Sequence, residues 1–404
     1  KGGKALDRIK VMAIFGTRPE AIKMAPVVDE LRRHPGEIET VVAVTAQHRE
    51  MLDQVLDLFG ISPDYDLDIM REGQSLSEII TKSIMGLEGP IVWEAPQLVL
   101  VHGDTSTTFG GSLISFYHQI PVGHVEAGLR TREKYNPFPE EMNRRLTGVV
   151  ADLHFAPLPT HKANLMRENV PEGCIFVTGN TVIDALFAAA EKPYEFSHPE
   201  LRSIDFEGKR VLLVTAHRRE NLGDPLRNIC LGLRDVVRRF KDVELVFPVH
   251  MNPLVRNTVR EILGREERVH LIEPVDYHTM VNLMKRAYLV LTDSGGLQEE
   301  APSLRKPVLV LREVTERPEG LEAGTLRLIG TSREGVVAGA RLLLENEEEY
   351  ERMATAPNPY GDGKASKRIV QAILYHFGLR REPPEEFVSP SRYLPDPPCT
   401  PRSP

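Results

Sequence analysis

The alternation of short apolar runs with longer segments of helical period constrains the fold of this chain most. The first half contains VMAIF at 11–15 and LVLVHGD at 98–104, and the second half repeats the plan with RVLLVTA at 210–216 and AYLVLTD at 287–293. Continuous apolar strands separated by helices are typical of parallel sheets that helices cover on both faces. The sequence therefore predicts an α/β fold built from doubly wound sheets.

Length and a local change of composition predict two domains. The chain has 404 residues, which suits two domains of ordinary size. A polar, proline-bearing segment between 180 and 208 separates the two halves. We expect Rossmann-like domains over 9–182 and 205–362 that face a cleft, and a Pro-rich tail over 379–404 with little fixed structure. Ligands of such sheets bind beyond the carboxyl ends of the strands.

Charge and cysteine content exclude several classes of partner. The formal net charge of −8 argues against a nucleic-acid or anionic-membrane partner. No stretch approaches the roughly 20 apolar residues of a membrane span. The three cysteines lie far apart in the sequence, which favours a reducing cytoplasm and no structural zinc. No HExxH motif is present, and the histidine spacing predicts no metal site.

The segment LTDSGGLQEE at 291–300 allows two interpretations. DSGG suggests a serine-protease nucleophile, but such proteases are all-β, and this chain is α/β without a GxSxG elbow. The alternative places Ser294 at the start of a helix, where Gly295 and Gly296 let an anion approach backbone N–H groups. An ordinary serine N-cap would explain Ser294 alone, and the basic residues elsewhere favour the anion site.

Cationic residues follow several other predicted strands. FGTRPEAIK places Arg18 and Lys23 around one strand-to-helix turn, VTAHRREN places His217 after a second strand, and REVTERPEG places Arg317 after a third. Each of them could be a surface charge when taken alone. Because the chain is acidic overall, their gathering at strand ends favours a diphosphate held across the cleft.

Carboxylates follow the strands of the first half. Asp104 ends VHGD, where it could cap a helix, and Glu126 follows another apolar run. A carboxylate in such surroundings is costly unless it is paired or functional. Glu140 and Glu141 stand in a first helical turn, where the helix dipole or a pair between Glu140 and Arg144 would explain one of the two. No GxGxxG or P-loop motif accompanies these acids.

Together these motifs resemble the non-hydrolysing UDP-N-acetylglucosamine 2-epimerases. The segments that carry the resemblance are FGTRPEAIKMAP, TAQHREML, HGDTSTT, HVEAGLRT, NPFPEEMNRR, TAHRREN, FPVHMNP and LTDSGGLQEEAPSLRKPVLVLREVTERPEG. They span residues 10–377, and their order is specific although each piece alone is weak. The resemblance implies the GT-B fold, in which a last helix, here at about 364–378, returns to the first domain.

The resemblance also implies a reaction and its residues. Family members interconvert UDP-N-acetylglucosamine and UDP-N-acetylmannosamine without NAD, by elimination of UDP and its re-addition, and supply surface polysaccharide synthesis. It implies a cytoplasmic homodimer with UDP-N-acetylglucosamine and UDP as ligands. The acid/base candidates, with a histidine beside the diphosphate, are Asp104, Glu126, Glu140 and His217. The implied UDP-binding residues are Arg18, Lys23, Ser294, Gly295, Gly296, Arg317 and, at the ribose, Glu300.

Several positions depart from the family pattern. Some bacterial members bind a second, activating substrate molecule through Gln-His followed by another Gln, and through an Arg. Gln47 and His48 match this possible allosteric site, but Glu50 and Gly73 replace the other two residues, which argues against substrate activation.

Three other functions remain open from the sequence. They are a GT-B glycosyltransferase that uses the same donor, a hydrolysing epimerase that releases free N-acetylmannosamine, and a non-catalytic nucleotide-sugar sensor. A glycosyltransferase would not need three acids around C-2, and the retention of these acids argues against a sensor.

Near the uracil, Val275 and Met280 stand where a Gln and a Phe are common in the family, which predicts a looser base pocket.

Overall fold

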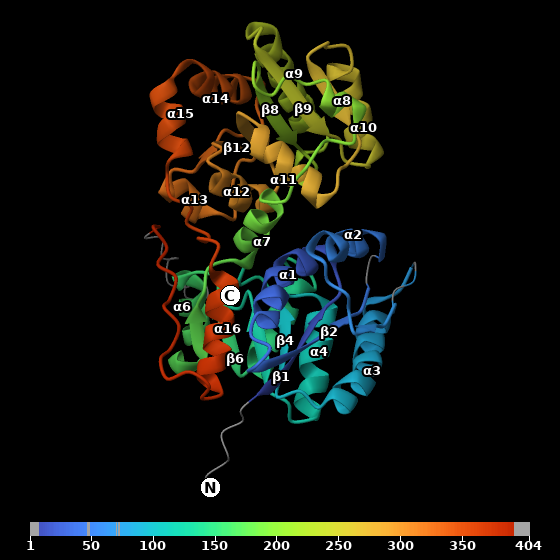
Figure 1. The fold of residues 1–404 in the computed structure, drawn as a ribbon. Helices are drawn as coiled ribbons and strands as arrows, with labels where there is room; N and C mark the ends of the chain where they lie inside the picture. Colours follow the sequence, from blue (N-terminus) through green and yellow to red (C-terminus); the bar gives the residue numbers. More distant parts are fainter. Residues whose placement is uncertain (1–7, 47–48, 70, 72, 392–404) are drawn as a thin grey trace, which may run out of the picture. The chain divides into compact units, whose positions relative to one another are not determined.

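The computed structural model describes residues 8–46, 49–69, 71 and 73–391. The chain divides into two compact units (Figure 1). Unit 1 holds the residues up to Ala188 together with Gly361–Ser389, and unit 2 holds Ala189–Tyr360. The chain therefore passes from unit 1 to unit 2 inside a helix and returns after Tyr360.

Unit 1 contains a seven-stranded sheet in the order β3-β2-β1-β4-β5-β6-β7, with every neighbouring pair parallel. Its strands are β1 (Ile9–Phe15), β2 (Ile38–Val44), β3 (Tyr65–Asp66), β4 (Leu98–His102), β5 (Val122–Val125), β6 (Leu153–Ala156) and β7 (Ile175–Val177). Its helices are α1 (Arg18–Arg32), α2 (Arg49–Phe59), α3 (Leu76–Glu94), α4 (Ser106–Tyr117), α5 (Glu140–Val150), α6 (Pro159–Arg167), α7 (Thr181–Ala190), which continues into unit 2, and α16 (Ala365–His376).

Unit 2 contains a six-stranded parallel sheet in the order β10-β9-β8-β11-β12-β13. Its strands are β8 (Arg210–Thr215), β9 (Val243–Pro248), β10 (Val269–Ile272), β11 (Leu289–Thr292), β12 (Val308–Val310) and β13 (Leu326–Leu328). Its helices are α8 (Pro199–Arg202), α9 (Asp224–Arg239), α10 (Pro253–Leu263), α11 (Tyr277–Arg286), α12 (Gly295–Glu300), α13 (Pro318–Ala323), α14 (Arg333–Glu345) and α15 (Glu347–Ala354).

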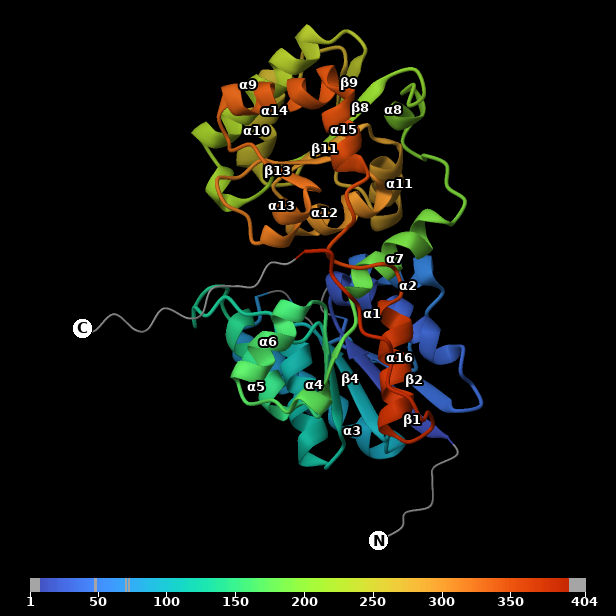
Figure 2. The ribbon, with the colours of Figure 1, turned by 90° about the vertical axis from the view of Figure 1, so that its left-hand side faces the viewer.

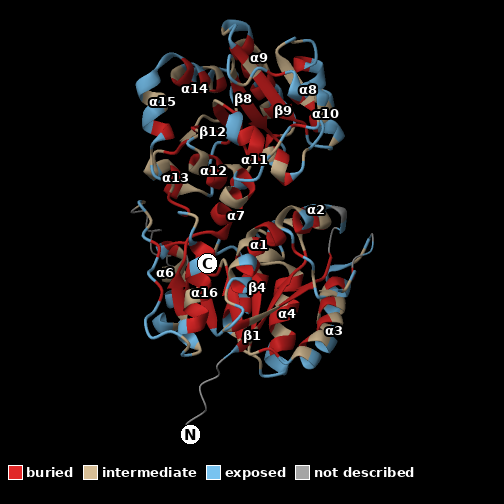
Figure 3. Ribbon diagram, viewed as in Figure 1, coloured by how far each residue is buried: buried red, intermediate tan, exposed pale blue. Residues whose placement is uncertain are grey.

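Both sheets confirm the predicted doubly wound α/β plan. In each, the strand order reverses between two central strands, which are β1 and β4 in unit 1 and β8 and β11 in unit 2. The central strands are buried (Figure 3), as expected where helices cover both faces. Such a reversal opens a crevice at the carboxyl ends of the two strands, where ligands of these folds bind.

The first helix begins where its sequence signals predict. Thr17 is the N-cap of α1 and forms a capping box with Glu20, while Pro19 lies in the first turn. The Glu20 carboxylate also accepts a hydrogen bond from the Thr105 hydroxyl at 2.6 Å. It thereby ties the turn after β1 to the turn after β4, the two central turns of the unit 1 sheet.

In helix α4, the large apolar residues that recur at helical period are not the residues that are buried. Phe109, Leu113, Phe116 and Tyr117 share one face, but Phe116 and Tyr117 are 59% and 64% exposed. Small residues are buried instead, and a Cβ on Gly111 would lie 3.5 Å from the side chain of Ile14 on β1. The large apolar side chains therefore face away from the core of unit 1.

The C-terminal part of the chain returns to unit 1. Helix α16 lies beside α1 (Figure 2), and Asp184 on α7 accepts hydrogen bonds from the first backbone amides of α16, including that of Ser366 at 2.8 Å. Residues 379–391 form no helix or strand, yet Phe387 is buried and its amide donates to Val177 O at 2.8 Å. This stretch of the Pro-rich segment therefore has a defined position, which the sequence did not predict.

Candidate active site

The turn after β4 presents Asp104. Thr105, not Asp104, is the N-cap of α4, because its hydroxyl accepts a hydrogen bond from the backbone amide of Thr108 at 3.1 Å. The Asp104 carboxylate pairs with the guanidinium of Arg144 on α5, and its backbone carbonyl accepts from Asn143 Nδ2 at 2.9 Å. Burial raises the pKa of Asp104; Arg144 opposes this shift and the charge of Glu126 adds to it. Asp104 is therefore not needed as a helix cap, and two neighbouring carboxylates influence each other's ionisation.

The turn after β5 presents Glu126 beside Asp104. Glu126 adopts a positive φ of 64°, and its Oε1 pairs with the ammonium of Lys23 on α1. Its Oε2 lies 3.7 Å from Nε2 of His102, the last residue of β4. The structure thus brings Asp104, Glu126 and Lys23 together at the point where the strand order reverses. Lys23, assigned to the diphosphate from the sequence, pairs here with an acid.

The two glutamates at the start of α5 have different environments. The Glu141 side chain is fully buried and accepts from the backbone amides of Thr131 and Arg132 at 3.0 and 3.2 Å. Arg144 pairs with Glu141 and Asp104, so the suggested pair between Glu140 and Arg144 is wrong. Glu141 is the structural glutamate of the two, and Glu140 is half-buried one position before it.

Three buried histidines lie on three neighbouring strands behind this site. His102 is on β4, His124 on β5 and His154 on β6, and His124 and His154 are direct register neighbours. Burial is the main cause that lowers their pKa values, to about 4, about 3 and about 4, respectively. These imidazoles are therefore neutral at pH 7.

Unit 2 places the predicted glycine-rich segment at the start of α12. Ser294 is the N-cap position but makes no side-chain cap bond, and its amide donates to Thr292 Oγ1 at 2.9 Å. A Cβ on Gly295 would lie 3.5 Å from the guanidinium of Arg317 and 3.7 Å from that of Arg218. Two guanidinium groups therefore flank a helix start that has no side chain of its own in the way.

The other predicted site residues of unit 2, Glu300, Arg317 and His217, lie in defined surroundings. Glu300 is 6% exposed and accepts a hydrogen bond from the Tyr277 hydroxyl at 2.7 Å, so it is not a solvated helix residue. Its other oxygen would be 3.6 Å from a Cβ on Gly296. Arg317 donates from Nε to the buried carboxylate of Glu299. His217 follows β8, which is next to β11 in the sheet.

Other sequence candidates lie in the following places. Arg18 is the first residue of α1 and is half-buried. Gln47 and His48 lie outside the described residues. Val275 and Met280 are half-buried, before and within α11.

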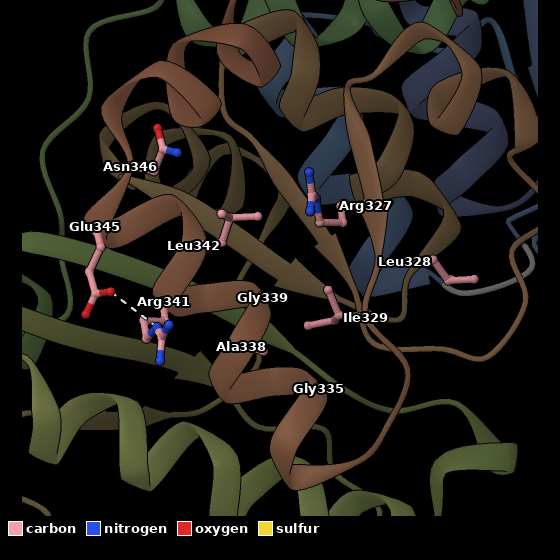
Figure 4. Close-up of a pocket in the computed structure, with 10 residues that line it drawn as sticks. All are labelled: Arg327, Leu328, Ile329, Gly335, Ala338, Gly339, Arg341, Leu342, Glu345 and Asn346. Carbon is pink, nitrogen blue, oxygen red and sulfur yellow. Dashed lines mark ion pairs between the residues drawn. The ribbon is translucent and has the colours of Figure 1, made fainter.

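Three further structural observations bear on other kinds of site. Within the described ranges, no group of three or more histidine, cysteine or acidic side chains could hold a metal ion. A hollow of about 540 Å³ lies between the end of β13 and α14, lined by residues such as Arg327, Leu342 and Arg341 (Figure 4). None of the predicted site residues lines it. In the part of the chain that the structure describes, no helix has the length and apolar character needed to cross a membrane.

Two Rossmann-like units, each with a doubly wound parallel sheet, define an α/β protein of the GT-B type. The family model described as UDP-N-acetylglucosamine 2-epimerase matches residues 29–374. A Bacillus subtilis protein named UDP-N-acetylglucosamine 2-epimerase is 55% identical over 383 residues, covering 95% of this chain and 100% of the relative. This chain therefore belongs to the UDP-N-acetylglucosamine 2-epimerase family, as its resemblance predicted.

Solved structures agree with this assignment. A Neisseria meningitidis UDP-GlcNAc 2-epimerase bound to UDP-GlcNAc has a TM-score of 0.80 at 50% identity, over 91% of this chain and 100% of that one. The S. aureus protein MnaA in a structure with UDP has a TM-score of 0.82 at 52% identity, over 94% and 100%. The similarity extends over both units, which confirms the two Rossmann-like domains of the predicted fold.

Sequence reasoning missed several partners of the site residues. His102 and Arg144 contact the acids of unit 1, and Tyr277, Glu299 and Asp293 contact candidate residues of unit 2. His102 and Asp293 stand at strand ends within motifs that had been singled out, so their position was a usable signal. Arg144 and Tyr277 lie on helices, and only the packing of those helices brings them to the site.

Proposed function

We propose that this protein is an isomerase that interconverts UDP-N-acetylglucosamine and UDP-N-acetylmannosamine by inversion at C-2, without hydrolysis. The observation that carries the proposal is the pair of carboxylates, Asp104 and Glu126, at the sheet reversal of unit 1, each with a cation beside it. Family membership and the 50% identical Neisseria protein bound to UDP-GlcNAc support the choice of substrate.

The chemistry has to overcome the weak acidity of the C-2 hydrogen. That hydrogen is not next to a ketone, so direct deprotonation is unfavourable. In the proposed route the C-1–oxygen bond breaks, UDP carries away the bonding electrons, and a carboxylate takes the C-2 proton. This leaves 2-acetamidoglucal, which is protonated on the opposite face of C-2 while UDP adds back at C-1. No net oxidation occurs, so no step needs NAD.

Unit 1 would supply the proton transfers. General acid–base catalysis needs one group that is protonated and one that is ionised at the working pH. Burial raises the pKa of Asp104, which favours its protonated form, and Glu126 beside it is ion-paired with Lys23. Glu140 is the third acid of the proposal because its neighbour Glu141 is occupied in buried hydrogen bonds.

Unit 2 would hold the nucleotide. Departure of UDP develops negative charge on the diphosphate, and oriented amides and guanidinium groups stabilise such charge. The Ser294 side chain and the amides of Gly295 and Gly296, with Arg317 and His217, form the proposed diphosphate set, and Glu300 would bind the ribose hydroxyls. Arg18 and Lys23 of unit 1 remain candidates for the same anion, although Lys23 pairs with Glu126 in this structure.

The reaction in heavy water tests this proposal. UDP-N-acetylglucosamine is incubated with the protein in D₂O without NAD or any acceptor, and the products are followed by NMR. We expect the manno isomer with deuterium at C-2 and no free sugar. Retention of hydrogen at C-2 would contradict the elimination route. Release of free N-acetylmannosamine would indicate a hydrolysing enzyme, and an unchanged substrate would favour a glycosyltransferase or a sensor.

The proposal includes an assembly and a location. Exposed apolar side chains occur on α3, α4 and α5, which pack side by side, and include Met85, Trp93, Phe116 and Val149. Exposed apolar side chains on neighbouring helices are typical of an interface, which suits the homodimer that the resemblance implies. A cytoplasmic location and a supply of surface polysaccharide precursors remain predictions.

A further inference from the structure

Asp293 is a buried carboxylate in the turn that follows β11. Its side chain has no exposed surface. One oxygen, Oδ2, accepts from the backbone amides of His217 and Arg218, both at 2.8 Å, and from Asn221 Nδ2 at 3.0 Å. Asn221 also donates to Leu311 O at 3.0 Å. These bonds join the turn after β8 to the turn after β11, and they occupy only one of the two carboxylate oxygens.

The second oxygen of Asp293 is directed at an imidazole. Oδ1 makes no hydrogen bond among the described residues, and Nδ1 of His217 lies 3.3 Å from it, within ion-pair distance. The two rings of His217 and His250 stack with centroids 5.7 Å apart and planes 15° apart. A buried carboxylate oxygen accepts and cannot donate, so this geometry favours a proton on Nδ1 of His217.

The surroundings of this imidazole favour its neutral form. Burial lowers the pKa of His217 most, Asp293 opposes that shift, and His250 and Arg218 add to it. A neutral imidazole carries one proton, and Asp293 directs it to Nδ1. The remaining nitrogen, Nε2, then has an unshared electron pair, and the His217 side chain is 38% exposed.

We propose that Asp293 is a positioning residue that fixes His217 as the Nδ1–H tautomer and leaves Nε2 for the substrate. This inference rests on the proposed function, in which His217 lies beside the departing diphosphate. When Nε2 takes up a proton from solvent, it can donate a hydrogen bond to a phosphate oxygen, and the Asp293 carboxylate stabilises the resulting imidazolium. Asp293 acts through His217 and is not expected to touch the substrate.

The substitution Asp293→Asn separates this role from a purely structural one. The asparagine carbonyl oxygen can still accept from the two amides and from Asn221, so the joined turns keep their bonds. Its NH₂ group would then face Nδ1 of His217, which must become the acceptor. The ring is thereby forced into the Nε2–H tautomer, with little change in packing.

Nitrogen NMR of protein labelled with ¹⁵N-histidine measures the tautomer directly. The chain has 13 histidines, and loss of one signal set in His217→Gln assigns the ring. We expect His217 as Nδ1–H in the wild type and as Nε2–H in Asp293→Asn. An Nε2–H ring in the wild type would overturn the proposal even if the variant failed to fold. An unchanged tautomer in a folded variant would do the same.

Kinetics test whether the Asp293 carboxylate matters for turnover. The Nε2–H ring of Asp293→Asn can still donate to a phosphate oxygen, but no carboxylate stabilises its imidazolium, so we expect kcat to fall by roughly 10–100-fold with KM changed much less. The double variant with His217→Asn should be no slower than His217→Asn alone. Multiplied effects in the double variant would show that Asp293 acts independently of His217.

A matched control removes a different carboxylate from the same unit. Asp235 pairs with Arg333 at the surface of unit 2, and Asp235→Asn should keep both the wild-type turnover and the His217 signals. Failure of the proposed function would be visible separately, because the wild type itself would then yield no manno isomer. The NMR result on the tautomer does not depend on that assay.

Discussion

At the scale of single residues, burial distinguishes side chains that the sequence presents as equivalent. Glu140 and Glu141 are adjacent, identical and both in the first turn of α5. Glu141 is enclosed and satisfies two backbone amides, whereas Glu140 is half-buried. A carboxylate that already serves as a structural acceptor is a poor choice for proton transfer, because protonation would break its bonds.

The first prediction is that a glutamine substitution at Glu140 lowers turnover, whereas the same substitution at Glu141 lowers stability. Glu140→Gln should lower kcat by roughly 100-fold or more, because it removes a general acid or base, and should leave the urea midpoint unchanged. Glu141→Gln should lower the free energy of unfolding by about 1–3 kcal/mol, because it weakens buried charged hydrogen bonds. A Glu140→Gln variant with full turnover would remove Glu140 from the mechanism. Glu133→Gln, an exposed glutamate on the same segment, is the control.

The start of α12 gives a second prediction at the residue scale. Gly295 is flanked by the guanidinium groups of Arg317 and Arg218 at ordinary contact distance from a Cβ. Gly295→Ala should therefore fold normally, and its methyl group should obstruct the approach of a phosphate to the amides. We expect at least about tenfold weaker UDP binding, or 1.4 kcal/mol, by titration calorimetry. Gly89→Ala, where a Cβ meets nothing within 4 Å, should bind UDP like the wild type.

At the scale of elements, neighbouring strands combine features that are distant in the sequence. His102 ends β4, and His124 and His154 lie within β5 and β6. Because these three strands are neighbours in the sheet, the histidines lie in one buried region. Their pKa values are lowered to about 4, 3 and 4 because burial penalises the charged ring. This group makes the stability of unit 1 depend on pH.

The sign of that dependence follows from proton uptake. A histidine with an ordinary pKa near 6.5 in the unfolded chain takes up a proton there before it does in the folded protein. Its stabilising contribution is therefore complete above pH 6.5 and is lost as the pH falls towards the folded value near 4. The three buried histidines act in the same direction.

Acid sensitivity that depends on one histidine is the third prediction. Between pH 7 and pH 5, the free energy of unfolding of His154→Gln should fall by about 2 kcal/mol less than that of the wild type. Urea unfolding at the two pH values measures both. Equal losses in wild type and His154→Gln would contradict the assignment of this effect to His154.

At the scale of the whole molecule, one plan is used twice with different chemistry. Each unit winds a parallel sheet outward from two central strands, and each presents polar residues after those strands. In unit 1 these are mainly acids, and in unit 2 they are mainly cations, glycines and a histidine. A reaction that moves a proton and releases a diphosphate needs both sets, so we expect neither unit alone to be active.

Dissociation of the expected homodimer is the fourth prediction. Val149 on α5 is 84% exposed, so Val149→Glu should not disturb the fold of unit 1. It would place a charge among the exposed apolar side chains of α3, α4 and α5 and should prevent dimer formation. Sedimentation should give twice the chain mass for the wild type and the chain mass for the variant. Val388→Glu, equally exposed but outside these helices, should remain dimeric; a monomeric wild type would contradict the prediction.

Local patterns in the sequence predicted much of the fold and much of the list of candidate site residues. Continuous apolar runs such as those of β4 and β11 indicate parallel strands because only strands covered on both faces exclude polar residues altogether. Parallel strands place their following residues at one edge, which made Asp104, Glu126, His217 and Ser294 candidates by position, and the resemblance to the family then implied their roles. The specific order of motifs then identified the family.

Only the tertiary structure shows which residue each site residue pairs with, because local sequence patterns do not identify partners that are distant in the sequence. The pairing of Arg144 with Asp104, of Lys23 with Glu126 and of Asp293 with His217 joins residues 40, 103 and 76 positions apart. Burial and pKa are properties of such surroundings, because desolvation and charge act through space and not along the chain. For the same reason the apolar face of α4 could be read from its period, while its exposure could not.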